Sequence, residues 1–176
     1  MKVAFLDRDG VINTEVNYLH RINDFEYTHK CKDALLQLIK KGFKLIIVTN
    51  QAGIAKAIFT EEEYYKLTDF YKEDLFKDNI LIHDIFYCPH HVDGVLKNFS
   101  IECNCRKPKP GMFIDAIEKH NIDINSSIMV GDKISDIDAA ESAGIRNLFL
   151  VESGQPIECD ERAIICKNLY DVSCLI

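Results

Sequence analysis

The chain begins with a short apolar run that ends in two aspartates, and this feature constrains the fold more than any other. Residues 3–6 are all apolar, which is typical of a buried strand of a parallel sheet. Asp7 and Asp9 follow at once, with Gly10 behind them. Open α/β sheets place their sites at the carboxyl ends of such strands. Because residues two apart in an extended chain point the same way, we expect both carboxylates to face one site.

A pair of carboxylates at this position is suited to catalysis. One can attack as a nucleophile while its neighbour transfers protons. The two would repel at neutral pH unless a divalent cation lay between them, and hard oxygen ligands favour Mg²⁺. The structural alternative is an Asp-Arg-Asp-Gly turn that only closes the strand, since Asp and Gly are ordinary turn residues.

Strands and helices alternate along the rest of the chain. We expect further strands over residues 43–48, 82–87, 127–130, 147–151 and 163–166, and helices over 33–41, 60–77, 111–120, 135–143 and 169–175. Thr60 and the three glutamates behind it predict a capping box. Such alternation predicts an α/β fold, a single Rossmann-like, doubly wound parallel sheet over residues 1–176. The connections leave no room for a large cap domain, so loops 14–27 and 88–110 would control access to the site.

The charge of the chain limits its partners. A formal net charge of -7 leaves no basic surplus for nucleic acid or an anionic membrane surface. No apolar run approaches membrane-spanning length, and Met1 and Lys2 lead directly into a strand with no room for a signal peptide. We therefore expect a cytoplasmic monomer whose partner is a small molecule.

Polar groups from four strand or loop ends meet at one edge of the predicted sheet. They are Asp7 and Asp9, Thr49 with Asn50, Lys107, and Asp132. Together they supply a nucleophile, an acid/base, hydroxyl and amide donors, a cation and a further carboxylate for a metal. Phosphoryl transfer through an aspartyl-phosphate requires this set. Singly, Thr49 could merely end a strand and Asp132 could cap a helix, but the joint pattern favours catalysis.

Three of the seven cysteines lie close together in the 88–110 loop. Cys88 and His90, followed by Cys103 and Cys105, offer three thiolates and one imidazole, which suits tetrahedral Zn²⁺. His91 is the competing imidazole. With four protein ligands the zinc would be structural and would hold the loop that carries Arg106 and Lys107. The other cysteines have no visible partner and are expected to be small core residues: Cys31, Cys159, Cys166 and Cys174.

These motifs resemble the haloacid dehalogenase (HAD) superfamily of phosphatases. Within it they are similar to the histidinol-phosphatase-like family, which contains the D-glycero-D-manno-heptose 1,7-bisphosphate 7-phosphatases and the histidinol-phosphate phosphatases. The blocks that carry the resemblance are residues 5–13, 49–55, 88–91, 103–112 and 129–133. Two positions depart from the pattern: Ala52 stands where a serine is frequent, and residues 15–18 lack the usual glycine. These departures bear on specificity more than on chemistry.

The resemblance implies a role for each residue of the motifs. Asp7 would attack the phosphorus, and Asp9 would protonate the leaving oxygen and then activate water. Thr49 and Lys107 would hold the phosphoryl oxygens, while Asp132, the Asp7 carboxylate and the Asp9 carbonyl would bind Mg²⁺. Asp136 would orient Asp132 or Lys133. Substrate contacts are implied for Glu15, Val16, Asn17, Tyr18, Asn50, Gln51, Ala52, Arg106 and Lys133. Among them, the fork of Arg106 suits a second phosphate.

The function that the resemblance implies is Mg²⁺-dependent removal of the 7-phosphate of heptose 1,7-bisphosphate, toward nucleotide-activated heptose for surface polysaccharide. The nearest alternative is a histidinol-phosphate phosphatase, with the same chemistry on another leaving group. A non-catalytic, zinc-bearing binding module is the alternative from another class. The intact set of Asp7, Asp9, Thr49, Lys107 and Asp132 argues against it.

Overall fold

In the computed structural model, which describes residues 1–154 and 160–176, six parallel strands form one sheet. Their order is β3-β2-β1-β4-β5-β6. The strands are β1 (Val3–Leu6), β2 (Lys44–Asn50), β3 (Ile82–Cys88), β4 (Ile128–Gly131), β5 (Asn147–Val151) and β6 (Ile164–Cys166). Because the order reverses direction between β1 and β4, their carboxyl ends flank the point at which doubly wound sheets open a crevice.

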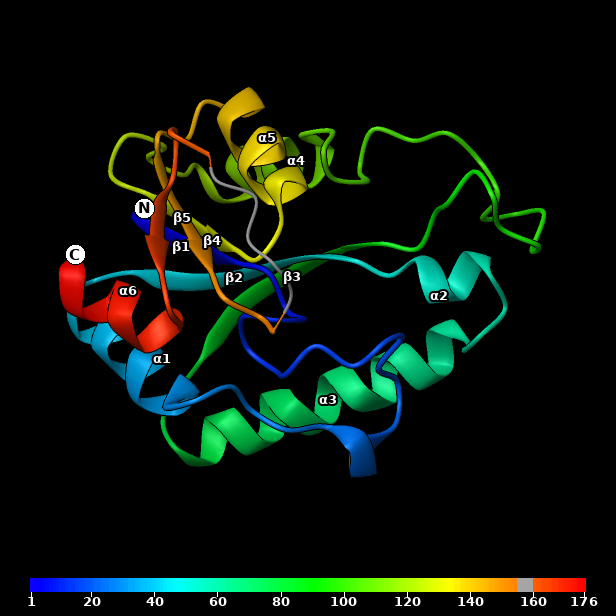
Figure 1. Ribbon diagram of the computed structural model, residues 1–176, viewed down its shortest axis with the longest axis horizontal. Helices are drawn as coiled ribbons and strands as arrows, with labels where there is room; N and C mark the ends of the chain where they lie inside the picture. The colour runs from blue at the N-terminus through cyan, green and yellow to red at the C-terminus, as the bar shows by residue number, and fades with distance from the viewer. Residues whose placement is uncertain (155–159) are drawn as a thin grey trace.

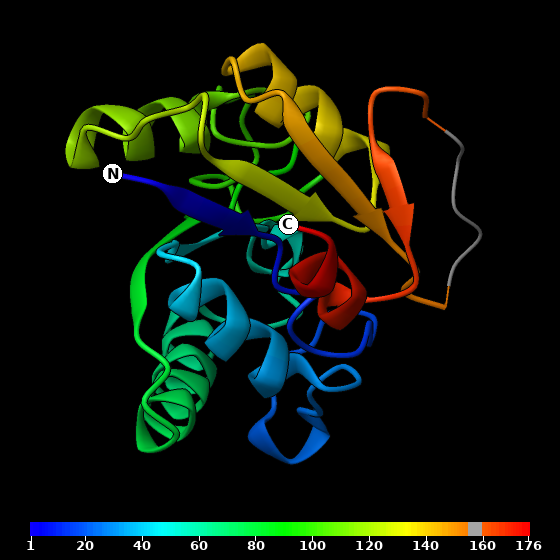
Figure 2. The same cartoon turned by 90° about the vertical axis from the view of Figure 1, so that its left-hand side faces the viewer.

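Helices cover both faces of the sheet, as Figures 1 and 2 show. On one face lie α1 (Cys31–Lys40), α3 (Glu61–Lys77) and α6 (Leu169–Leu175), and on the other α4 (Gly111–His120) and α5 (Ile134–Ser142). Two short elements follow strands at the carboxyl edge: the 3-10 turn η1 (Ile22–Asp24) and α2 (Ala52–Ala55).

The alternation of side chains along the strands divides the core in two. In β1, Ala4 and Leu6 pack toward α1, α3 and α6, whereas Val3 and Phe5 pack toward α4 and α5. Both faces are covered, so every residue of this strand is apolar and buried. The central strands are thereby fixed in position, and their carboxyl ends form a rigid base for the site.

Two helix ends match their sequence signals. At the start of α3, Thr60 Oγ1 accepts a hydrogen bond from Glu63 N at 3.1 Å, and Glu63 Oε2 accepts one from Thr60 N at 2.8 Å, which completes the capping box. After α1, Gly42 adopts a φ of +86°, a left-handed conformation that glycine reaches without strain.

The predicted fold class is confirmed: one parallel, doubly wound sheet, with no separate cap among the described residues. β1, β5, α4 and α6 coincide with their predicted ranges, and β2 runs two residues further than expected, to Asn50. The 3-10 turn η1 and the helix α2 were not predicted. No described helix is long and apolar enough to cross a membrane.

The expectation for the unpaired cysteines is only partly met. Cys31 and Cys166 are buried, as predicted. Cys174 is exposed, so its assignment to the core was wrong: α6 buries Leu169 and Val172, and Cys174 lies on a different side of that helix. Cys159 lies outside the described residues.

Candidate active site

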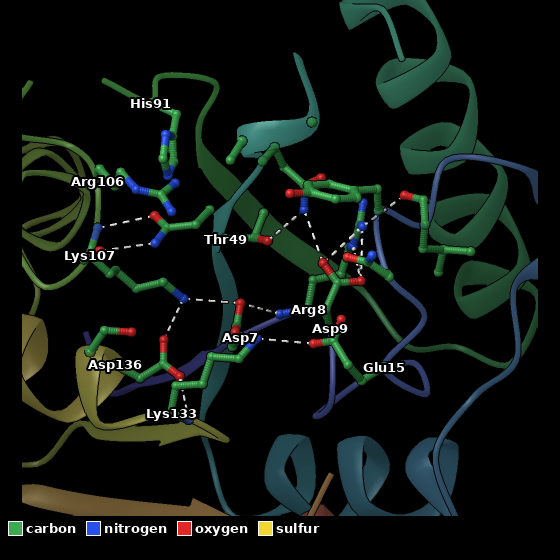
Figure 3. A pocket seen from close by; sticks show the side chains of 18 of the residues that line it. Asp7, Arg8, Asp9, Glu15, Thr49, His91, Arg106, Lys107, Lys133 and Asp136 are labelled. Carbon is green, nitrogen blue, oxygen red and sulfur yellow. Dashed lines mark hydrogen bonds and ion pairs between the residues drawn. The ribbon is translucent and has the colours of Figure 1, made fainter. Parts of the chain in front are cut away.

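A cleft of about 460 Å³ opens at the carboxyl ends of the central strands. Its walls come from the segments after β1, β2 and β4 and from the loop between β3 and α4. Asp7, Thr49, Lys107 and Asp136 lie at its base, as Figure 3 shows. The topology therefore brings together the polar groups that were predicted from the sequence to lie at the carboxyl edge of the sheet.

Lys107 lies between two buried carboxylates. Its Nζ is 3.0 Å from Asp7 Oδ1 and 2.6 Å from Asp136 Oδ1, and it donates a hydrogen bond to the Val48 carbonyl at 2.7 Å. With three acceptors, the three protons of the ammonium group are all used. This one side chain connects the loop before α4 to Asp7 at the end of β1 and to Asp136 in α5 (Figure 3), and also to Val48 in β2.

Burial changes the titration of the groups at the base. It raises the pKa of Asp7 to about 8; Lys107 opposes that rise, and neighbouring carboxylates add to it. Burial also opposes the charge on Lys107, but Asp136 and Asp7 outweigh it and raise the pKa of that ammonium. Lys107 is therefore cationic. Asp7 in the free protein is mostly protonated at neutral pH, because its pKa is about 8.

Three carboxylates form a candidate metal centre. Oxygens of Asp7, Asp132 and Asp136 all lie within 4.8 Å of one another. Both carboxylate oxygens of Asp132 are buried and have no hydrogen-bond partner of normal geometry among the described residues, and Lys133 Nζ, at 3.9 Å from Oδ2, is too far to donate one. Buried carboxylate oxygens without donors are costly unless a cation satisfies them. The donor set is all oxygen, which fits Mg²⁺.

Two glycines allow this close approach. A Cβ on Gly10, whose φ is +84°, would lie 2.5 Å from Asp132 Oδ2. A Cβ on Gly131 would lie 2.3 Å from the Cβ of Asp136. Only glycine fits at either position, so the backbones after β1 and β4 can pack directly against the carboxylates.

Asp136 has a larger role than the sequence indicated. Its Oδ2 accepts hydrogen bonds from the backbone N–H groups of Asp132 and Lys133, at 3.2 and 3.0 Å, as expected of a residue that orients them. Its other oxygen, Oδ1, pairs with Lys107 at 2.6 Å. Asp136 therefore fixes both the ammonium group of Lys107 and the backbone at Asp132 and Lys133, the segment that carries the predicted metal ligand.

The Asp9 carboxylate lies apart from this cluster. Its oxygens accept hydrogen bonds from Arg8, from Asn13 Nδ2 at 3.0 Å and from Gln51 Nε2 at 3.1 Å. The spacing of the two aspartates suggested a cation between their side chains. The geometry does not favour that arrangement. Asp9 is ion-paired with a buried arginine instead, and its backbone carbonyl stays a predicted metal ligand.

Thr49, Asn50 and Gln51 follow β2 into the cleft. Thr49 is buried, and its Oγ1 accepts a hydrogen bond from Gln51 Nε2 at 2.8 Å. Asn50 bonds the backbone of Lys107 twice, each time at 3.0 Å, through Nδ2 to the carbonyl and through Oδ1 from the N–H. The strand end thus positions both groups that were predicted to hold phosphoryl oxygens.

The outer wall of the cleft contains the predicted substrate residues. Val16, Asn17, Tyr18 and Ala52 line it. Glu15 pairs with Lys133 at 3.1 Å, and Tyr18 Oη accepts a hydrogen bond from Lys56 Nζ at 2.9 Å.

Arg106 lines the cleft together with His91 (Figure 3), and Lys56 lines it as well. Burial lowers the pKa of His91, and the charges of Arg106 and Lys56 lower it further. Arg106 and Lys56 are therefore the cations of this part of the cleft, and both lie close enough to His91 to disfavour its protonation.

The predicted zinc ligands converge on one point. The donor atoms of Cys88, His90, Cys103 and Cys105 lie within 4.8 Å of one another. The sulfur of Cys88 is 3.6 Å from that of Cys103 and 3.1 Å from that of Cys105. Sulfurs bound tetrahedrally to zinc lie about 3.8 Å apart, so the set fits the ion. His91 is not in this cluster, and its Nδ1 accepts a hydrogen bond from Asp93 N at 3.1 Å.

Comparison with known proteins identifies the family. A HAD-hydrolase-like family model matches residues 104–171. The D-glycero-α-D-manno-heptose-1,7-bisphosphate 7-phosphatase of Photorhabdus laumondii is 55% identical, and the match covers 100% of this chain and 97% of that protein. The β-anomer 7-phosphatase of the same organism is 41% identical over 96% of this chain and 92% of that protein. The chain belongs to the heptose-bisphosphate phosphatase family.

A solved structure agrees with this assignment. The D,D-heptose 1,7-bisphosphate phosphatase of B. bronchiseptica, complexed with magnesium and phosphate, has a TM-score of 0.84 and 27% identity, with 98% of this chain and 96% of that chain covered. Members of this family are HAD-superfamily hydrolases, so the protein is a phosphoric monoester hydrolase. The resemblance seen in the sequence motifs is confirmed.

Two cationic residues of this site, Arg8 and Lys56, were not predicted from the sequence. Arg8 stands between the two motif aspartates, where it reads as part of a turn. Lys56 follows α2, a one-turn helix too short to show a periodic pattern. Side chains alternate along an extended chain, so the residue between Asp7 and Asp9 is expected to point away from them, and no local signal identified Arg8 as a site residue.

Asp136 provides a test of the buried ion pairs. We expect Asp136→Ala to lower the free energy of unfolding by about 3 kcal/mol, because it leaves Lys107 with one carboxylate fewer and two buried N–H groups without an acceptor. Asp138→Ala, on the same helix, removes an exposed pair with Arg162 and should change it by less than about 1 kcal/mol. Urea unfolding of both variants measures the difference, and equal effects would contradict this account of the site.

Proposed function

We propose that the protein removes the 7-phosphate of D-glycero-α-D-manno-heptose 1,7-bisphosphate by way of an aspartyl-phosphate. The observation that carries this proposal is the pairing of a nucleophile with two separate basic groups in one cleft. Lys107 lies beside Asp7 at the base, and Arg106 and Lys56 line another part of the same cleft. A substrate with a phosphate at each end matches this distribution of charge.

In the first half of the reaction, an Asp7 oxygen attacks the phosphorus while the bond to the sugar oxygen breaks. Asp9 gives its proton to that oxygen, which leaves as a hydroxyl. Lys107 and Thr49 bind the phosphoryl oxygens as their charge redistributes in the transition state. The donors are held in advance, since Lys107 is fixed by Asp136 and Val48 and Thr49 is bonded to Gln51.

In the second half, the Asp9 carboxylate takes a proton from water, and the oxygen of that water attacks the phosphorus. The bond between phosphorus and Asp7 breaks, which releases inorganic phosphate and restores the Asp7 carboxylate. Asp9 is protonated again and ready for the next substrate. One residue therefore acts as acid and then as base, which requires that its carboxylate stay in place through both steps.

Mg²⁺ would be held by the carboxylates of Asp7 and Asp132 and by the carbonyl of Asp9. When bound, it would neutralise charge on the phosphoryl group and favour the ionised form of Asp7. Two observations support this choice: the buried oxygens of Asp132, which have no hydrogen-bond donor of normal geometry, and the raised pKa of Asp7.

Magnesium affinity should depend on pH. Because the pKa of Asp7 is raised to about 8, protons compete with the metal below that pH. We expect the Mg²⁺ affinity to rise by up to about tenfold per unit between pH 6 and pH 8, and to level off above pH 8. Calorimetric titration at several pH values measures this. Asp7→Asn should bind weakly with little pH dependence, whereas Asp9→Asn, outside the carboxylate cluster, should keep the wild-type slope. An equal slope in all three proteins would contradict the assignment.

The α-anomer is supported by the relatives. The protein that is 55% identical is an α-anomer phosphatase, while the β-anomer phosphatase of the same organism is 41% identical. Neither the histidinol-phosphate reading nor the non-catalytic module is favoured, because these full-length relatives are heptose-bisphosphate phosphatases.

Phosphate release in Mg²⁺ buffer tests the function. We expect kcat/KM for the α-anomer to exceed that for the β-anomer by at least about tenfold, and that for histidinol phosphate by at least about a hundredfold, or about 3 kcal/mol of transition-state binding. Asp7→Asn should reduce turnover by at least about 1,000-fold, because it removes the nucleophile. A preference for the β-anomer would reassign the anomer alone. A preference for histidinol phosphate, or no release from any of them, would overturn the proposal.

We further propose that the thiol cluster binds one structural Zn²⁺. Four protein ligands leave no open position for chemistry on such an ion. Cys105 is followed at once by Arg106 and Lys107, so the metal would fix the loop that delivers both cations to the cleft. The oligomeric state, the cytoplasmic location and the single-domain assignment stay predictions.

Metal analysis tests the zinc site. We expect about one zinc per chain in the wild-type protein, and a loss of both the zinc and most of the activity in Cys105→Ser. Cys174→Ser is the matched control, because its exposed thiol lies in α6, outside the cluster, and it should keep the zinc and the wild-type kcat. Full zinc content in Cys105→Ser would contradict the ligand set.

A further inference from the structure

Arg8, between the two motif aspartates, is the largest fully buried side chain among the described residues, with 1% of its surface exposed. Its Nε and Nη2 donate to Asp9 Oδ1 at 3.2 and 2.9 Å, and Nη2 also donates to Asp9 Oδ2 at 2.9 Å. A planar guanidinium that meets both oxygens fixes the plane of a carboxylate as well as its distance.

The same guanidinium contacts the loop that lines the cleft. Arg8 Nη2 donates to the Leu19 carbonyl at 3.1 Å, and Leu19 directly follows the predicted substrate residues 15–18. On its other side lies α3, whose Tyr64 and Tyr71 are near enough to act on its charge. Arg8 therefore joins Asp9 to the loop that lines the cleft.

A turn that merely closes β1 would not require such a residue. A buried guanidinium is costly unless it is paired, and Arg8 is paired with the carboxylate of Asp9. Asn13 and Gln51 also donate to Asp9, but each reaches only one oxygen, Oδ1 and Oδ2 respectively. Arg8 is the only one of the three that donates to both oxygens, so it sets the orientation of the carboxylate.

We propose that Arg8 is the positioning residue for Asp9: it holds the carboxylate in one plane and ties it to the 14–27 loop. The inference rests on the proton-transfer role proposed for Asp9. Misplacement of a reacting group by about 1 Å can slow a reaction by about a hundredfold. Loss of the fork should therefore lower kcat far more than it raises KM, because Arg8 is buried and its donors are directed at Asp9 and the Leu19 carbonyl.

A double-mutant cycle tests this proposal with phosphate release from the heptose bisphosphate. We expect Arg8→Gln to lower kcat by about 100-fold and Arg8→Lys by about tenfold, since lysine keeps the charge but not the fork, with KM within about threefold of wild type. In the Asp9→Asn background, Arg8→Gln should change kcat by less than about threefold, because its effect passes through Asp9. Arg162→Gln is the control: it removes an exposed arginine that also pairs with carboxylates, and it should keep the wild-type kcat.

Several results would overturn the proposal. One is a wild-type kcat in folded Arg8→Lys, the variant that keeps the charge and is the decisive one if Arg8→Gln does not fold. Another is a full 100-fold loss in the Asp9→Asn background, which would assign Arg8 a structural role independent of Asp9. Failure of the proposed function is a distinct outcome: Asp9→Asn itself would then keep wild-type turnover, or the wild-type protein would release no phosphate.

Discussion

The buried ammonium of Lys107 is the interaction on which the rest of the site depends. Its three acceptors come from the residue directly after β1, from β2 and from α5, so one side chain joins three parts of the chain that are distant in sequence. Because a buried cation is stable only when it is paired, Asp7 and Asp136 must stay within reach of it. The position of Asp7, the nucleophile, is thus fixed by the need of the Lys107 ammonium group for a paired carboxylate.

Strand order explains how a chain of this size assembles such a site without a separate cap. The reversal of order between β1 and β4 places Asp7 and Asp132 side by side, and Gly10 and Gly131 let the backbones approach. The remaining cation arrives on the long loop after β3, which has little regular structure of its own. Asn50 bonds the backbone of Lys107 at both its N–H and its carbonyl, so the loop is registered against the end of β2.

Much of this could be predicted because the signals are local. The buried strands are continuous apolar runs, α3 has its capping box, and the site residues follow strand ends whose position the topology dictates. The orientation of Asp9 could not be predicted in this way. Spacing along an extended strand puts Asp9 beside Asp7, but the chain turns at Gly10, and the buried charge of Arg8 draws the carboxylate aside. Long-range pairings of this kind, like the exposure of Cys174, depend on tertiary packing that no local pattern contains.

The balance of charge at the base of the cleft connects structure to chemistry. When Asp7, Asp132 and Asp136 are all ionised, Lys107 offsets one of three negative charges. Lys133 lies 3.9 Å from Asp132 but pairs more closely with Glu15, at 3.1 Å, so two negative charges remain. Without a cation, burial and mutual repulsion favour uptake of a proton, and the raised pKa of Asp7 expresses that tendency. A protonated Asp7 is a poor nucleophile. A divalent cation would supply the missing two charges, and the same imbalance that selects the ion would make the nucleophile reactive when the ion is bound. The arrangement therefore links metal occupancy to catalytic competence through electrostatics alone.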